Sequence, residues 1–223
     1  MTSGYYFNSH SHKKPQLLNE ITIRNAYLNS FIPSNHHYYL SVGIHPWIVT
    51  QTNWKKAKTK LELFLNEPKV LALGEVGLDR LKPNWDLQKS TLTKQLEIAE
   101  KIGKPVIIHC VKAYSDLFSF IKSFQIKFIL HAYHGNSFQT EQFLNHENVF
   151  FSLGENSLTG KQIDWLKIIP PNKIFLETDT SKMRIDAIYQ LMSDLHNISE
   201  ANLRIQVQKN FETTFGFEAQ FQE

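Results

Sequence analysis

The chain has 223 residues, 42% of them hydrophobic and 20% charged, which predicts a single globular domain over residues 1–223. Its net charge of +3 is too small to indicate a nucleic-acid-binding surface unless the basic residues cluster locally. The single cysteine, Cys110, excludes an intrachain disulfide, and no segment approaches the roughly 18 apolar residues of a membrane span, so we expect a cytoplasmic protein that does not enter a membrane.

Short apolar runs, rich in β-branched or aromatic residues, are predicted as buried strands. In chain order these runs are 4–8, 20–26, 37–45, 70–78, 105–111, 127–133, 149–154 and 173–179. From the third run onward they alternate with helical patterns at 53–67, 86–102, 114–124, 138–145, 160–168 and 184–195, followed by a last helix at 199–214. Strands that alternate with helices indicate parallel βαβ units.

This order of elements predicts an α/β fold, a TIM-like (β/α) barrel. The barrel is expected to be short and irregular in its first three strands, because these leave no room for full helices between them. A doubly wound open sheet is the structural alternative. In a barrel the carboxyl ends of all the strands meet on one face, and active sites of this fold are built there.

Candidate metal ligands stand at the ends of five predicted strands. His10 and His12 are two residues apart, so they project to the same side if the first strand continues through them. Alone this pair is a weak signal, and a surface loop is its ordinary explanation. Later strands add the donors Glu75, His109 and His131, and the last predicted strand ends in Glu177-Thr178-Asp179. Buried ionisable groups are costly unless paired or metal-bound, so a metal centre is favoured over a network of paired histidines and carboxylates.

The motifs HSH, GIHPW, GEVGLD, PVIIHC, LHAYHG and LETD, in this order, resemble those of the TatD-related metal-dependent hydrolases. This family is a branch of the amidohydrolase superfamily and includes deoxyribonucleases. The resemblance spans residues 10–179, and the stretch KNFETTFGF at 209–217 is similar to the family's C-terminal helix. It implies a barrel enzyme that hydrolyses phosphodiester bonds, with DNA, expected to be single-stranded, as the partner.

The resemblance also implies two divalent ions, for which zinc, manganese and magnesium are the candidates. The six ligands would divide between the ions, with His10, His12 and Asp179 on the first, His109 and His131 on the second, and Glu75 bridging both. A water activated by the ions would be the nucleophile. Asp179 and Glu75 would thus be the catalytic residues, with Asp179 orienting the water and accepting its proton.

Further residues near the motifs are candidates for substrate contact, namely His45, Lys112 and His134. Each of them has an ordinary alternative as a loop or solvated side chain. Asp79 is expected either to brace the metal ligands or to accept a loop hydrogen bond. Cys110 follows His109 on a strand, so it should point to the opposite face and into packing.

The chain departs from the family pattern at three places. Val111, followed by Lys112, stands two residues past His109, where many members have an arginine. Asn8 precedes the HSH motif where members commonly have aspartate, and its amide is expected to hold a histidine by a weaker hydrogen bond. After LETD the sequence TSKMRIDAIYQL runs directly into a helix, where members usually carry a basic loop. Two alternatives therefore stay open: hydrolysis of a small-molecule amide, ester or lactone, and a degenerate metal-binding barrel without catalysis. The oligomeric state stays open too.

Overall fold

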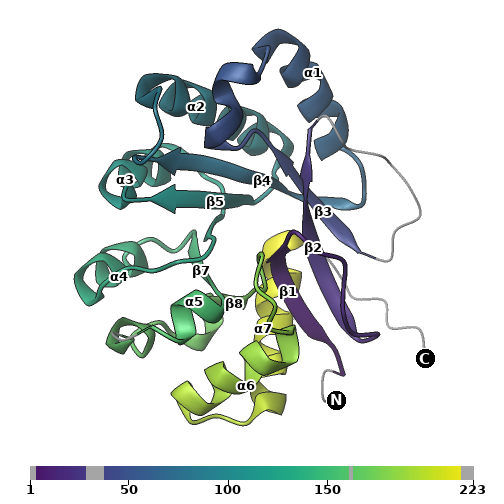
Figure 1. Ribbon diagram of the computed structural model, residues 1–223, viewed down its shortest axis with the longest axis vertical. Coiled ribbons are helices and arrows are strands. Elements are labelled where there is room, and N and C mark those ends of the chain that lie inside the picture. Colours follow the sequence, from purple (N-terminus) through teal and green to yellow (C-terminus); the bar gives the residue numbers. More distant parts are fainter. Residues whose placement is uncertain (1–3, 29–37, 161–162, 217–223) are drawn as a thin grey trace.

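The computed structural model describes residues 4–28, 38–160 and 163–216. A parallel sheet of eight strands forms its centre, and the strands follow one another in sequence order. Figure 1 shows this sheet with helices around it. The strands are β1 (Tyr6–Ser11), β2 (Glu20–Tyr27), β3 (Tyr39–Gly43), β4 (Val70–Asp79), β5 (Val106–Val111), β6 (Phe128–Leu130), β7 (Val149–Leu153) and β8 (Ile174–Leu176). The sheet order agrees with the predicted barrel and not with a doubly wound sheet, in which the strand order reverses.

The first and last strands meet, so the sheet nearly closes on itself. Ser11, at the end of β1, forms an isolated parallel bridge with Asp179, three residues beyond β8. Two backbone hydrogen bonds support the bridge: the His12 amide donates to the Asp179 carbonyl at 3.1 Å, and the Asp179 amide donates to the His10 carbonyl at 3.1 Å. The seam of the barrel therefore lies between the two ends of the chain.

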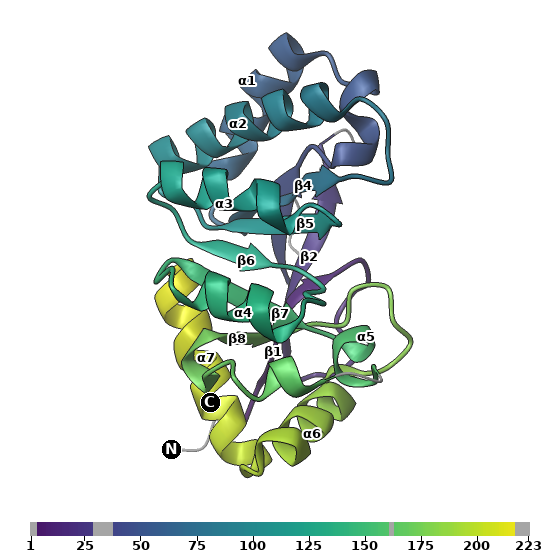
Figure 2. The same cartoon turned by 90° about the vertical axis from the view of Figure 1, so that its left-hand side faces the viewer.

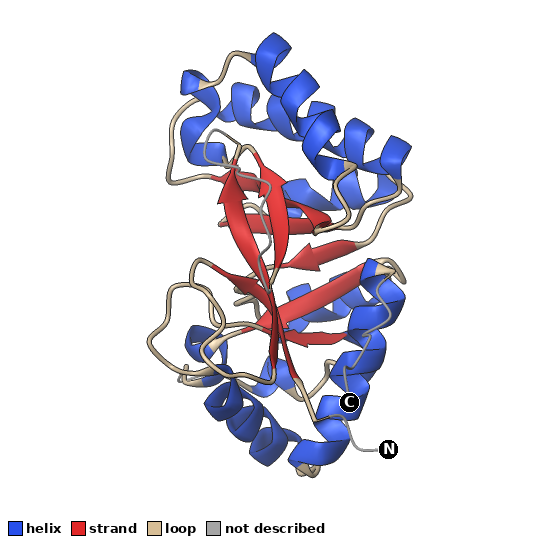
Figure 3. Ribbon diagram, turned by 90° about the vertical axis from the view of Figure 1, so that its right-hand side faces the viewer, coloured by secondary structure: helices blue, strands red, loops and turns tan. Residues whose placement is uncertain are grey.

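The helices lie outside the strands, as Figures 2 and 3 show. They are α1 (Trp54–Leu65), α2 (Trp85–Ile102), α3 (Tyr114–Ser123), α4 (Ser137–Leu144), α5 (Glu155–Leu158), α6 (Ile185–His196) and α7 (Glu200–Phe215), with short 3₁₀ turns η1 (Pro46–Gln51), η2 (Asp164–Leu166) and η3 (Pro171–Lys173). Residues 12–19, between β1 and β2, contain no helix, as expected for the first part of the barrel. Within the described ranges, no helix combines the length and apolarity that crossing a membrane requires.

The two C-terminal helices cover β1, which has no helix of its own. The ring of Phe7 lies 5.0 Å from that of Phe211 on α7. The Tyr189 hydroxyl on α6 donates to the Phe7 carbonyl and accepts from the Phe7 amide, both at 3.1 Å. Ser199 caps α7 by accepting a hydrogen bond from the Asn202 amide at 3.3 Å, because serine is a favoured residue at a helix start. These contacts hold the strand that carries two of the predicted ligands.

The predicted helix at 160–168 is wrong. In the described residues, the short helix α5 ends before residue 160, and the predicted range itself contains the 3₁₀ turn η2. Pro170 and Pro171 follow directly, and a proline disfavours helical geometry in the residue before it, so a helix here has little room to extend. His37, the first residue of the third predicted strand, and Phe217, the last of the C-terminal motif, lie outside the described residues.

Candidate metal centre

The Glu75 carboxylate stands at the centre of the cluster formed by the carboxyl ends of the strands, and only 5% of the residue is exposed. Its Oε2 atom lies 3.7 Å from His10 Nε2 and 3.5 Å from His12 Nε2. Across from it, Asp179 Oδ1 lies 3.8 Å from His10 Nε2 and 3.6 Å from His12 Nε2. These gaps are too long for hydrogen bonds. They suit a shared cation, because two ligands about 2.1 Å from a tetrahedral ion lie about 3.4 Å apart.

A second group of imidazoles surrounds the other oxygen of Glu75. Oε1 lies 2.8 Å from His109 Nδ1 and 3.6 Å from His131 Nε2. The ring of His131 also lies beside that of His10, with 4.1 Å between centroids, so the two halves of the cluster are contiguous. Glu75 is therefore the one side chain of this cluster whose two oxygens face both groups of donors.

His45 lies within this cluster, next to the ligands rather than apart from them. Its Nε2 atom is 3.2 Å from Glu75 Oε1, and its Nδ1 atom accepts a hydrogen bond from the Trp47 amide at 3.2 Å. Since Nδ1 is an acceptor, the ring proton is on Nε2, and the imidazole donates to Glu75. This arrangement makes His45 a hydrogen-bond donor at the edge of the cluster.

The charge states of the central residues fit a divalent cation. Burial lowers the pKa of His10 well below its ordinary value, so its imidazole is neutral, as a metal ligand must be. Burial by itself would raise the pKa of Glu75, but hydrogen bonds from neighbouring histidines lower it well below the usual range. Both ring nitrogens of His10 are buried without a hydrogen-bond partner in the described part of the chain. An ion between His10 Nε2 and Glu75 Oε2 would give both of these buried atoms a partner.

The backbone at these strand ends is unusual. Lys112, Ala132 and Asp179 have positive φ angles of 51°, 44° and 47°, which cost of order 1 kcal/mol or more for residues with a side chain. Each follows a strand that delivers a donor. In β4, a Cβ atom at Gly77 would lie 1.9 Å from the His109 carbonyl oxygen, so only glycine lets β4 approach β5 this closely. The positive φ angles and the close approach of β4 to β5 both help to position the donors, and the φ angles do so at a cost in stability.

Glu177 stands at the end of the last predicted strand, but the sequence did not assign it a role in the site. It is fully buried, its Oε1 atom lies 2.8 Å from His131 Nδ1, and the same oxygen accepts the Ala132 amide at 2.9 Å. The Ser152 hydroxyl donates to its other oxygen. Burial would lower the pKa of His131, but the Glu177 carboxylate raises it to about 10. With this raised pKa the metal-free His131 carries a proton on both ring nitrogens, so an ion at Nε2 would displace one proton while Glu177 holds the other on Nδ1.

Replacing Glu177 with glutamine should weaken metal binding about 10- to 100-fold with little change of shape, because His131 loses the carboxylate that orients it. Competition with a metal-binding dye measures this affinity. The matched control is Glu141→Gln, which changes an exposed carboxylate on α4 in the same way. Equal affinities for the two variants would show that Glu177 does not support the ligand.

The remaining candidate residues lie around the cluster. Lys112 is exposed just beyond β5, and His134 is exposed with its ring 5.8 Å from that of Trp165. Neither belongs to the donor groups in the described residues. Of its two expected roles, Asp79 shows the loop hydrogen bond, because Oδ1 accepts the Leu81 amide at 2.8 Å, whereas Oδ2 lies 3.6 Å from His109 Nε2, too far for a hydrogen bond.

Asn8 does not hold a histidine through its amide, contrary to expectation. Its Nδ2 group donates to Glu20 at 2.8 Å and to the Thr178 hydroxyl at 2.9 Å, and its Oδ1 atom accepts the Thr178 amide at 3.1 Å. Asn8 therefore braces β1 against β2 and against the segment after β8. The orientation of His10 and His12 does not depend on it directly.

Cys110 packs against the core next to the cluster, and burial raises the pKa of its thiol. Because the thiolate is the reactive form, the native protein should react with a disulfide reagent at pH 8 at least about tenfold more slowly than the unfolded chain. The rate of thiol release in buffer and in guanidinium measures this difference. Equal rates would mean that the thiol is accessible and ionised, which would contradict its packing against the core.

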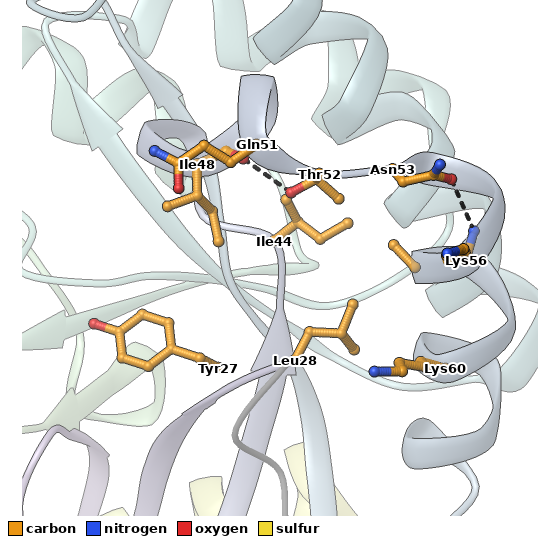
Figure 4. Close-up of a pocket in the computed structure, with 10 residues that line it drawn as sticks. Tyr27, Leu28, Ile44, Ile48, Gln51, Thr52, Asn53, Lys56 and Lys60 are labelled. Carbon is orange, nitrogen blue, oxygen red and sulfur yellow. Dashed lines mark hydrogen bonds between the residues drawn. The ribbon is translucent and has the colours of Figure 1, made fainter.

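A separate cavity of about 260 Å³ lies beside the cluster, between the end of β2, η1 and α1. Figure 4 shows Leu28, Ile44 and Ile48 gathered around it, with Lys60 on α1 at its edge. Tyr27 also lines it, is half exposed, and has its ring 6.4 Å from that of His12. The cavity thus opens next to the first group of donors, with an aromatic ring between the two.

Comparisons with known proteins point to one family. Residues 25–216 match the family described as TatD related DNase. An uncharacterized metal-dependent hydrolase of Buchnera aphidicola is 27% identical over 216 residues, which cover 88% of this chain and 81% of that protein. The 3'-5' ssDNA/RNA exonuclease TatD of Enterobacter lignolyticus is 26% identical over 148 residues, covering 62% of this chain but only 56% of the exonuclease. The crystal structure of YjjV, a TatD homologue of Escherichia coli, has a TM-score of 0.84 and 19% identity, covering 96% of this chain and 98% of that one.

Proposed function

The chain belongs to the TatD related DNase family of metal-dependent hydrolases, and we propose that it hydrolyses phosphodiester bonds of single-stranded DNA. One observation carries the proposal: histidines from the ends of four strands, β1, β3, β5 and β6, surround the two oxygens of Glu75 on β4, and Asp179 beyond β8 faces the two histidines of β1. Their number and type are sufficient for two ions that share a carboxylate, as a two-metal hydrolytic site requires. Residues 1–223 would act as one hydrolase domain, in a reducing compartment such as the cytoplasm, as the single cysteine suggests.

The proposed ligands divide into two sets around the bridging Glu75. His10, His12 and Asp179 would hold one ion, and His109 and His131 the other. Zinc or manganese fits the histidine-rich donor set best, and magnesium fits it less well because magnesium prefers oxygen ligands. Bound ions would lower the pKa of a coordinated water and neutralise charge on the scissile phosphate.

The chain's own side chains supply the positioning and the proton transfer. The Asp179 side chain is 28% exposed, and its Oδ1 atom faces His10 and His12. The Thr180 hydroxyl donates to Oδ2 at 3.3 Å, which helps to hold the carboxylate in place. Asp179 would orient the attacking water and accept its proton. His45 would keep Glu75 ionised and aligned through its Nε2–H group.

The surroundings of the cluster support a nucleic-acid substrate over a small molecule. Half-exposed Trp47 and Tyr27 lie beside the histidine rings, the exposed Lys82 lies 4.5 Å from the Trp47 ring centroid, and Lys60 lines the same cavity as Tyr27. Aromatic faces with nearby lysines suit the bases and phosphates of a single strand. The cluster itself argues against a degenerate barrel, because every predicted ligand position carries a competent donor.

The test is cleavage of a single-stranded oligonucleotide labelled at one end. Chelator-treated protein is supplied with Mn²⁺, Mg²⁺ or Zn²⁺ in parallel with Asp179→Asn protein from a matched purification. Metal-dependent shortening by the wild type alone is expected, and the variant excludes a contaminating nuclease. If neither protein cleaves DNA while the wild type binds metal, DNA is the wrong substrate, and amides, esters and lactones are assayed next.

A further inference from the structure

Trp47 is a large aromatic side chain held at the edge of the metal centre, and 55% of it is exposed. It lies in η1, two residues after His45. Its ring centroid is 4.9 Å from that of His45 and 5.9 Å from that of His109, and it meets both rings edge to face at 88° and 83°. An exposed indole in contact with two imidazoles of the centre is within reach of whatever substrate enters.

A hydrogen bond to a buried carboxylate fixes the orientation of the Trp47 ring. Trp47 Nε1 donates to Asp79 Oδ2 at 2.7 Å, and only 2% of Asp79 is exposed. Asp79 is itself held, because its amide donates to Gln88 Oε1 at 2.8 Å. A rigid aromatic surface loses little conformational entropy when a ligand packs on it. The Trp47 ring is therefore held in one orientation while about half of the residue stays exposed.

A lysine accompanies the exposed ring. Lys82 Nζ lies 4.5 Å from the Trp47 ring centroid, and Lys82 itself is exposed. A cation at an aromatic face gains only about 0.5–1 kcal/mol at an exposed site, so this lysine is easily displaced. A nucleotide offers both groups what they can bind, with a flat base for the indole and a phosphate for the ammonium group.

We propose that Trp47 is the stacking platform for the nucleobase next to the scissile phosphate, and that Lys82 pairs with the adjoining phosphate. The inference rests on the proposed function, because it assumes that the substrate is a nucleic-acid strand. It assigns to Trp47 a contact with substrate that depends on its ring face. The hydrogen bond from Trp47 to Asp79 sets the orientation of the ring and is separate from the contact with the base.

Two substitutions separate stacking from support of Asp79. Trp47→Leu removes both the π face and the N–H donor, whereas Trp47→Phe removes the donor but keeps a face. Stacking of one base is worth about 1–3 kcal/mol, so Trp47→Leu should raise the Kd and KM for a single strand roughly 5- to 150-fold. Trp47→Phe should stay within about threefold of the wild type, and kcat should change little in either variant.

The decisive comparison uses an oligonucleotide with one abasic residue beside the cleaved bond. On this substrate the wild type and Trp47→Leu should behave alike, because no base is present to stack. Fluorescence anisotropy in an Asp179→Asn background reports the same difference in Kd without turnover. Trp54→Leu is the matched control, since Trp54 also has a lysine near its ring, with Lys94 at 5.6 Å, but lies on α1 outside the donor cluster.

The outcomes are distinguishable. An equal loss on intact and abasic strands, or equal losses in Trp47→Leu and Trp47→Phe, would overturn the inference and leave Trp47 as a support for Asp79. Binding by Trp47→Leu within twofold of the wild type would also overturn it. If the metal-loaded wild type neither binds nor cleaves any single strand, the proposed function itself is wrong, and the inference is wrong with it.

Discussion

The Asp179→Asn variant should lose hydrolysis by about a thousandfold or more in kcat while keeping its fold. General base catalysis alone contributes about 10²- to 10⁴-fold, and an amide cannot accept a proton from water. Asparagine tolerates the left-handed backbone of this position, where φ is 47°, so strain should not add to the effect. Single-turnover cleavage of a labelled single strand measures the loss, and circular dichroism checks the fold.

The matched control for this variant is Asp186→Asn. Asp186 lies in the first turn of α6 and pairs with Arg184 at 2.6 Å, outside the donor groups of the described residues. It should keep activity within about twofold of the wild type, since a partly exposed ion pair contributes about 1 kcal/mol at most to stability. If Asp179→Asn retained more than a tenth of the wild-type rate, the assignment of Asp179 as the proton acceptor would fail, and another group would have to be the base.

Replacing Glu75 with glutamine should remove metal from both halves of the cluster at once. Oε1 faces His109 and Oε2 faces His12, so one substitution takes a negative ligand from each set. The amide also presents an N–H group where a carboxylate oxygen stood, and it repels a cation. We expect less than one tightly bound ion per chain and activity reduced at least about a thousandfold, because two-metal stabilisation of the phosphate is lost.

Two measurements check this prediction. Elemental analysis after gel filtration gives the ions per chain, and thermal unfolding with and without Zn²⁺ gives the stabilisation by metal. An ion that binds only the folded state at 100 times its Kd stabilises by about 2.7 kcal/mol, so the wild type should show a clear increase in Tm and the variant none. Glu97→Gln, on the exposed face of α2, is the control. Two retained ions in Glu75→Gln would exclude it as the bridging ligand.

The strands were predictable because each is a short apolar run, and their alternation with helices was enough to predict a parallel barrel. The error at 160–168 shows the limit of periodicity, because Leu166 and Ile169 have helical spacing but two prolines follow them. The packing of α6 and α7 over β1 was not predictable either. The contact of Phe7 with Phe211 joins the two ends of the chain, and no local pattern encodes it.

The donor positions followed from two simple rules, the period of two along a strand and the convergence of carboxyl ends. The sequence could not rank Glu177 against Asp179, because both lie on the same face of the LETD segment. Only the structure shows Glu177 buried behind His131. It also shows Asn8 turned to Glu20, which depends on the register in which β1 pairs with β2.

The seam between β1 and β8 bears on how the protein is made. His10 and His12 are synthesised early, whereas Asp179 is synthesised after all eight strands. Chains fold progressively as they leave the ribosome, yet contacts between distant residues form late. A nascent chain would therefore lack the proposed first ion site until the bridge between Ser11 and Asp179 can close. An unfinished chain would carry His10 and His12 without the proposed proton acceptor, so translation itself would delay the activity of the hydrolase.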